Sequence, residues 1–375
     1  MNSEKIREPL FHIARRPYIS KVKAWCIRLV SLLLALLVCG ILIYTMTKLN
    51  PVKVYGTMWE GAFGSARKSW NTIRDTMFLL CIGVGLAPAF KMRFWNIGAE
   101  GQILVGGIAT AACMIYFGNS VPTPVLLIIM CIASAVAGAV WGLIPAIFKS
   151  RWGTNETLFT LMMNYVAIQL TSYFVSIWEN PKGSNSVGLI NPSTKDGWFP
   201  EIFGQQYTLN VIIVLAVVIF MFVYLRWSKQ GYEIAVVGES ENTAKYAGIK
   251  VSRVIMRTMA ISGCICGIAG FIAVSGSSHT ISTETSGGKG FTAIIVAWLA
   301  KFNTVVMIMI SLLLIFLERG ASEIASRYDL NDYASQMLTG IILFFILGSE
   351  FFINYELHFR HKENADAAKT EGEKK

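Results

Sequence analysis

Residues 25–46 read WCIRLVSLLLALLVCGILIYTM, and this run decides the class of fold. Crossing about 30 Å of hydrocarbon takes about 20 helical residues, and the run is that long with Arg28 as its charged side chain. Backbone groups that cannot reach water must be bonded within the segment, so such a span is a helix. A small-residue cleavage site does not follow the run, and we expect it to remain as a signal anchor.

The same pattern returns along the chain and gives about ten apolar segments in all. The segment 291–300 is too short to cross alone, so we expect a half-helix there, and we expect an interruption at Pro88. The sequence therefore predicts an all-α polytopic membrane protein with about ten transmembrane helices, broken or half helices included, across residues 25–354. The further segments are residues 76–90, 103–117, 125–148, 158–177, 209–225, 255–274, 291–300, 305–317 and 337–352.

Composition agrees with this class of protein. The 375 residues are 54% hydrophobic and 15% charged, which is too little polar surface for a soluble protein of this length. The net charge of +10 is divided among the segments between apolar runs, so it does not form the single basic face of a nucleic-acid-binding protein. The seven cysteines lie in or beside apolar runs, and the four histidines are isolated or in a charged tail, so we expect neither disulfides nor a metal site.

Basic residues between the spans predict the topology. Positive loops stay inside, which places the N-terminal arm (1–24), the long loop 226–254 and the charged tail (355–375) in the cytoplasm. The nearly neutral loop 178–207 is then external. Residues 48–75 also fall outside although they carry five basic residues. Either they form an amphipathic helix at the outer surface, or the count of spans before them is wrong by one.

The polar stretch FWNIGAEGQ (94–102) lies between two apolar segments, where polar side chains are costly unless they line a cavity or a helix break. Glu100 is the acidic residue that most needs an explanation. It either contacts the transported molecule, or it lies in the first turn of a helix capped by Asn96 and pairs with Lys91 or Arg93. The two roles are compatible.

Glycine pairs indicate where helices pack. Lipid supplies no hydrophobic drive between helices, so close association needs small residues. Gly138 with Gly142, and Gly263 with Gly267, are small-xxx-small pairs, and we expect them to be packing positions.

Three stretches carry a resemblance: NIGAEGQ (96–102), GESENTAKYAGIKVSR (238–253) and SGCICGIAG (262–270). They resemble the permease subunits of bacterial ABC importers in the ribose and branched-chain amino acid permease superfamily. The NIGAEGQ motif is most similar to the nucleoside-importer branch. The resemblance extends from about residue 76 to the last span.

The resemblance implies a permease in the bacterial cell membrane that docks an ATPase through a cytoplasmic coupling helix at residues 238–249. Ser240 and Glu241 stand where many relatives have Asn and Pro, which leaves the start of that helix open. The implied partners are an ABC ATPase subunit, a second and different permease chain, and an external lipoprotein that binds the substrate. The implied coupling residues are Gly238, Glu239, Ala244, Tyr246, Ala247, Gly248 and Ile249.

The chain itself is expected to be a non-catalytic transport subunit without cofactors. It has no Walker A loop, since the glycines of residues 287–290 lack the required spacing, so ATP and Mg²⁺ would bind the partner ATPase. A nucleoside would need aromatic stacking and amide or hydroxyl partners. Asn164 and Tyr165, chosen from position alone, have interhelical hydrogen bonding as an equal alternative. The substrate-path candidates are Trp95, Asn96, Glu100, Gln102, Asn164 and Tyr165.

Alternative functions remain open at this point. The same superfamily carries sugars and branched-chain amino acids. A secondary transporter driven by protons or sodium needs ionisable residues in several spans, and the predicted spans offer essentially Glu100 alone. An intramembrane enzyme needs a nucleophile with its base, or an HExxH motif, and the spans contain neither.

Overall fold

The computed structural model describes residues 11–16, 18–48, 50–329 and 332–359, so the beginning of the N-terminal arm and most of the charged tail lie outside the described residues. The chain divides into two compact units, Met1–Gly61 with Gly320–Lys375, and Ala62–Arg319. The described residues contain 9 helices long and apolar enough to cross a membrane, and the shorter apolar helix Lys289–Leu299. The prediction of an all-α polytopic protein with a half-helix is confirmed.

The first unit joins the two ends of the chain. Helix α1 (Lys21–Thr47) packs on α13 (Asp332–Asn354), and Arg28 Nη2 lies 2.6 Å from Glu350 Oε1 across that contact. Strand β1 (Phe11–Arg15) pairs antiparallel with β2 (Tyr355–Phe359). This small sheet was not predicted, because its strands are separated by almost the whole chain.

The segment 48–75 contains no additional span: it is divided between a short helix and the first turns of the next long helix. Helix α2 (Pro51–Phe63) is not among the spans, so their count stands. Helix α3 begins at Ala66, not at residue 76. Ser65 is its N-cap and accepts a hydrogen bond from Lys68 N, and the first turns of the helix are polar, so the apolar run did not mark them. The interruption expected at Pro88 was wrong: α3 (Ala66–Lys91) continues past it, as packed membrane helices tolerate an isolated proline.

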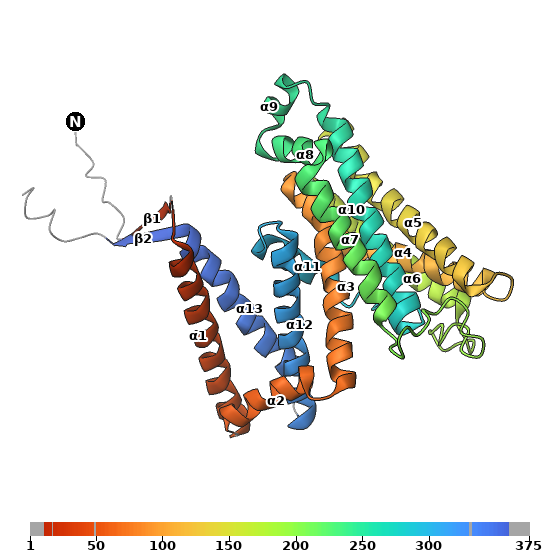
Figure 1. Cartoon of the computed structure of the whole chain (residues 1–375), viewed down its shortest axis with the longest axis horizontal. Helices are drawn as coiled ribbons and strands as arrows, with labels where there is room; N and C mark the ends of the chain where they lie inside the picture. The colour runs from red at the N-terminus through yellow and green to blue at the C-terminus, as the bar shows by residue number, and fades with distance from the viewer. Residues whose placement is uncertain (1–10, 17, 49, 330–331, 360–375) are drawn as a thin grey trace, which may run out of the picture. The chain divides into compact units, whose positions relative to one another are not determined.

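Helices α4 (Ala99–Phe117), α5 (Thr123–Trp152) and α10 (Val251–Ala273) form the core of the second unit with α3 (Figure 1). Their backbones nearly touch. A Cβ atom on Gly138 would lie 2.2 Å from Gly263 O, one on Gly142 2.8 Å from Met259 O, and one on Gly267 2.2 Å from Ser134 O. Side chains at these positions would separate α5 from α10.

The two ends of the second unit differ. One carries the short helices α8 (Lys229–Glu239) and α9 (Glu241–Tyr246), and the other carries the loop 179–207 (Figure 1). Three further spans lie in this part of the chain: α6 (Glu156–Trp178), α7 (Thr208–Trp227) and α12 (Thr304–Arg327), whose last turns belong to the first unit. The π-helical turn η1 (Val274–Ser278) extends α10, and the short helix α11 (Lys289–Leu299) follows it.

Candidate functional site

Glu100 is held by the loop that begins the half-helix α11. Its Oε1 accepts hydrogen bonds from Ser286 Oγ at 2.6 Å and Gly288 N at 2.9 Å, and its Oε2 accepts one from Gly290 N at 2.8 Å. The residue is only 7% exposed, in the first turn of α4. The carboxylate thus lies at the N-termini of two helices, where the aligned peptide dipoles favour a negative charge.

The hydrogen bonds of Glu100 can be compared with its two predicted roles, a contact with the transported molecule and a structural ion pair. Its bound partners are Ser286, Gly288 and Gly290, and not Lys91 or Arg93 as the sequence suggested. A Cβ atom on Gly290 would lie 2.5 Å from Glu100 Oε2, so the loop is shaped around the carboxylate. The contacts are those of a residue that ties α4 to α11. A direct contact with cargo remains a prediction.

Three amide side chains organise the turn that leads into α4. Asn96 Oδ1 accepts from Gly98 N at 3.0 Å, and its Nδ2 donates to Ser262 Oγ at 3.2 Å and faces Gln102. Asn164 Oδ1 accepts from Gly101 N at 2.9 Å while Nδ2 donates to Ile97 O at 2.9 Å. Asn96, Gln102 and Asn164 are all buried. Asn96 and Asn164 thus satisfy backbone N–H groups at the start of α4, while Gln102 faces the Asn96 side chain. The N-cap residue of α4 is Gly98, so the expected cap by Asn96 is not formed.

The two aromatic candidates lie apart from this buried cluster. Trp95 is 44% exposed and stacks on Trp298 with ring centroids 5.2 Å apart, beside Phe90 and Phe302. Tyr165 is 59% exposed on α6, whereas its neighbour Asn164 points inward. The structure therefore groups Asn96, Glu100, Gln102 and Asn164, but neither aromatic side chain closes over them.

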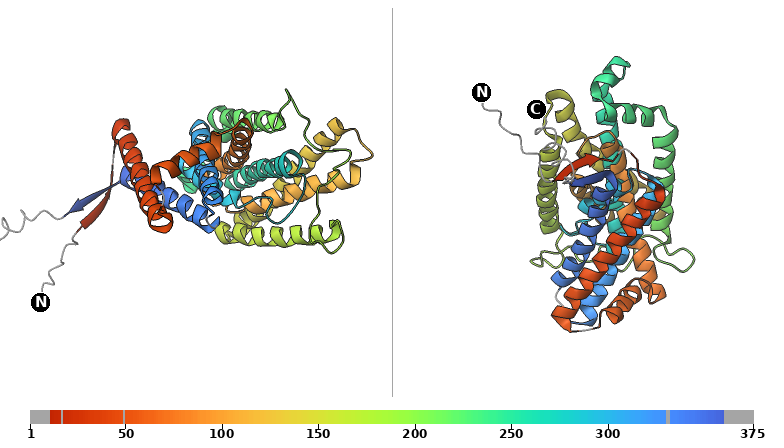
Figure 2. Two further views of the ribbon diagram at one scale, coloured as in Figure 1. Left: turned by 90° about the horizontal axis from the view of Figure 1, so that it is seen from below. Right: turned by 90° about the vertical axis from the view of Figure 1, so that its left-hand side faces the viewer.

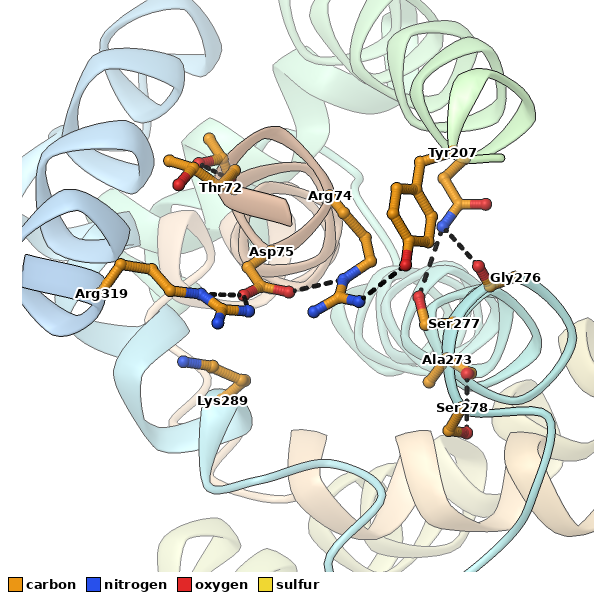
Figure 3. A network of polar contacts seen from close by, with 12 residues as sticks. Thr72, Arg74, Asp75, Tyr207, Ala273, Gly276, Ser277, Ser278, Lys289 and Arg319 are labelled. Atoms are coloured by element: carbon orange, nitrogen blue, oxygen red, sulfur yellow. Dashed lines mark hydrogen bonds and ion pairs between the residues drawn. The ribbon is translucent and has the colours of Figure 1, made fainter. Parts of the chain in front are cut away.

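A charged network between α3 and α12 was missed by the sequence analysis. Asp75 accepts hydrogen bonds from Arg74 Nε and Arg319 Nε, both at 2.8 Å, and Arg74 Nη1 donates to the Tyr207 hydroxyl at 3.2 Å (Figure 3). Lys289 and Glu318 form a further ion pair nearby. The expectation that Glu100 is essentially the one ionisable residue in the spans was wrong, because α3 and α12 are longer than their apolar runs.

We predict that Asp75→Asn lowers the apparent melting temperature of the purified protein in detergent. The change leaves two guanidinium groups facing each other without their shared counter-ion, at a cost of about 1–3 kcal/mol. Adding Arg319→Gln is expected to recover part of the loss. Glu201→Gln, an exposed carboxylate at the same end of the unit, is the control and should change nothing; an equal effect there would contradict the role of Asp75.

A pocket of about 450 Å³ opens beside this network, between the first turns of α3 and the turn before α7. It combines aromatic rings, amides and the Arg74 guanidinium, whose carbon lies 5.0 Å from the centre of the Tyr207 ring. Its lining residues are Ala66, Arg67, Trp70, Asn71, Arg74, Glu201, Gly204, Gln205, Gln206 and Tyr207.

His279 anchors the loop 179–207 at the same end of the unit. Its ring stacks on Trp198 with centroids 3.8 Å apart, and its carbonyl accepts a hydrogen bond from Ile190 N at 2.9 Å. Burial lowers the pKa of the imidazole, and the charge of Lys195 lowers this pKa further. A backbone hydrogen bond with Ser275 acts in the opposite direction but does not outweigh them. The ring is therefore neutral at pH 7 and serves as a flat packing surface.

The predicted coupling segment is two helices joined at Ser240, rather than one. Ser240 Oγ accepts from Thr243 N at 3.2 Å, which settles where α9 begins. Ala244 is fully buried, while Tyr246 is 94% exposed and Ala247 is exposed beside it. Gly248 (φ 76°) ends the segment, and Ile249 N donates to Ala244 O at 2.9 Å.

Helix α8 attaches this segment to the core. A Cβ atom on Gly238 would lie 2.1 Å from Lys91 O, so α8 contacts the end of α3 at a distance only glycine allows. Glu233 Oε2 pairs with Arg257 Nη2 of α10 at 3.0 Å. A force on α9 would therefore reach both α3 and α10.

Residues 70–347 match the family described as branched-chain amino acid transport system / permease component. The chain belongs to this family. The permease is thus an integral membrane protein and a transport component, of a family whose members work with ATPase and binding-protein partners.

Similar curated proteins cover most of the permease. It is 30% identical over 328 residues to the guanosine ABC transporter permease protein NupP of Bacillus subtilis, covering 86% of this chain and 92% of the relative. It is 26% identical to the nucleoside ABC transporter permease protein NupB of Lactococcus lactis subsp. cremoris (87% and 91%). It is 25% identical to the glucose ABC transporter permease protein TsgB13 of Haloferax volcanii (87% and 88%).

Proposed function

We propose that this permease carries nucleosides as the membrane subunit of an ATP-driven importer in the bacterial cell membrane. The named cargoes of two relatives, guanosine and nucleosides, support this choice of substrate. An external binding lipoprotein delivers the nucleoside, and a second, homologous permease chain completes the path. The N-terminus, the loop with α8 and α9, and the tail lie in the cytoplasm.

The observation that carries the proposal is the projecting pair α8–α9. It ends in exposed Tyr246 and Ala247 and is attached through Gly238 to α3 and through Glu233 to α10. A separate ATPase subunit binds this surface and hydrolyses ATP. Closure of its domains moves α9, and the attached helices change the access of the path from the outer to the inner side.

The experiment is uptake of radiolabelled guanosine and uridine by cells with and without this permease. We expect unlabelled nucleosides to compete, and ribose, glucose and valine not to compete. Uptake should fall when ATP is depleted and persist when a protonophore removes the ion gradient while ATP is maintained. If glucose or valine competed instead, the cargo would be a sugar or an amino acid and not a nucleoside. If uptake were lost when the ion gradient alone is removed, the transport would be ion-coupled and not ATP-driven.

A further inference from the structure

The pocket beside the charged network lies at the level where two spans leave their apolar runs. Trp70 and Arg74 line it from the polar first turns of α3, before the apolar run that begins at residue 76. Gln206 and Tyr207 line it from the turn directly before α7. The two helices lie side by side, α3 in orange and α7 in green (Figure 2). Tryptophan and tyrosine are enriched at the membrane–water interface, so the pocket opens at the depth of the lipid headgroups.

Two arginines give the pocket hydrogen-bond donors that the protein leaves unused. Arg74 donates through Nε to Asp75 and through Nη1 to Tyr207, while its Nη2 has no hydrogen-bond partner among the described residues (Figure 3). Arg67 is exposed, and its guanidinium forms no ion pair within the part of the chain that the structure describes. Since Asp75 also pairs with Arg319, it balances the charge of Arg74 only in part. The pocket therefore has spare positive charge and spare N–H donors.

The chemistry of the lining favours a phosphate group. The planar fork of an arginine pairs with two phosphate oxygens at once, and the amides of Asn71 and Gln205 can donate to further oxygens. Glu201 is the acidic residue of the lining, and it is exposed, so water solvates its charge. The two arginines outnumber it, and the volume of about 450 Å³ is that of a small-molecule site. An anionic phosphate ester of modest size matches both the charge and the volume.

The same pocket accounts for an exception in the topology. Basic residues collect on the inner side of membrane proteins, yet the segment 48–75 carries five of them and lies outside in the orientation given under the proposed function. Arg67 and Arg74 belong to this segment, and both line the pocket. Basic pockets between membrane helices bind anionic headgroups, so such a ligand explains why these charges lie there.

We propose that the pocket binds the phosphate headgroup of an anionic phospholipid from the outer leaflet. The choice of leaflet rests on the proposed function, through its orientation of the chain. Arg67 and Arg74 bind the phosphate oxygens, and the rings of Trp70 and Tyr207 lie beside the glycerol. The acyl chains continue along α7, whose apolar run is largely exposed. A lipid held in this way joins the first turns of α3 to the turn before α7.

Native mass spectrometry of the full-length, delipidated permease tests the site. Phosphatidylglycerol and phosphatidylcholine with identical acyl chains are titrated separately. We expect phosphatidylglycerol to bind more tightly, and Arg67→Gln to weaken its binding by about fivefold, the effect of one basic residue near a membrane surface. Arg67 is exposed, so its replacement should leave the lipid-free melting temperature unchanged. Arg151→Gln, which changes an exposed arginine at the end of α5, is the matched control and should bind phosphatidylglycerol as the wild type does.

The thermal stability of the same samples gives a second measurement. Phosphatidylglycerol should raise the melting temperature of the wild type more than that of Arg67→Gln, because a ligand that binds the folded state stabilises it. Equal affinities of the wild type and Arg67→Gln for phosphatidylglycerol would overturn the site. If that variant also lost guanosine uptake at unchanged lipid binding, Arg67 would contact a protein partner instead.

Two further results would overturn the choice of ligand. Displacement of the lipid by inorganic phosphate would assign the pocket to a soluble phosphate. Glu201→Gln should bind phosphatidylglycerol at least as tightly as the wild type, and weaker binding would require a headgroup that carries an amine. The lipid is measured in the absence of cargo. An error in the proposed nucleoside therefore leaves this test unaffected, and a failure to bind lipid leaves nucleoside transport standing.

Discussion

Glu100→Gln is expected to lower transport of every cargo by the same factor, together with the amount of folded permease. The two carboxylate oxygens accept three donors, from Ser286, Gly288 and Gly290. A glutamine has one oxygen and one NH₂ group at these places. Whichever way the amide is turned, the NH₂ group faces the N–H of Gly288 or Gly290. One buried backbone donor is then unpaired, which costs about 1–3 kcal/mol, and Glu100→Ala should cost more.

The chain offers a matched control for this change. Glu179 also accepts backbone N–H groups, from Gly183 at 2.9 Å and Asn185 at 3.3 Å, but in an exposed loop where water replaces a lost partner. Glu179→Gln should leave the melting temperature and uptake unchanged. The measurements are the apparent melting temperature in detergent and KM with kcat for several nucleosides. If Glu100→Gln altered the ranking of nucleosides at an unchanged melting temperature, Glu100 would contact cargo and the structural role would be wrong.

The case of Glu100 shows how far sequence reasoning reaches in this protein. The sequence identifies Glu100 as a carboxylate that needs a partner at membrane depth. Its partners are mostly backbone N–H groups of glycines almost two hundred positions away, which no side-chain pattern indicates. The expected partners, Lys91 and Arg93, were the nearest charges along the chain. Local sequence thus predicts that a polar group must be satisfied, but only the packing of α4 against α11 decides by what.

The start of a span was also only partly predictable from the sequence. Apolar runs predict that a helix crosses the membrane, but they do not mark where it begins when its first turns are polar. Helix α3 starts at Ala66 because Ser65 caps it, and its polar first half brings Arg74 and Asp75 into contact with Arg319. The serine cap and the adjacent Arg–Asp pair were visible in the sequence. The partner on α12 was not.

Ala247→Arg is expected to separate the permease from its ATPase without unfolding it. Ala247 is exposed beside Tyr246, so a long charged side chain there meets no neighbour within the chain but would meet the ATPase surface. Burying a new, unpaired charge in an interface costs several kcal/mol, enough to remove most of the complex. Ala244→Arg differs, because Ala244 is fully buried, and should unfold the segment itself.

The measurement is the amount of ATPase subunit that purifies with tagged permease, quantified by mass spectrometry, with membrane insertion and melting temperature as checks. Tyr246→Ala should also weaken the complex, since exposed aromatic residues commonly dominate docking energy. Arg151→Ala, exposed at the end of α5, is the control and should retain the ATPase. A complex that survives both Ala247→Arg and Tyr246→Ala would mean that the motor binds elsewhere. In that case the attachments of α8 to α3 and α10 would have no part in coupling.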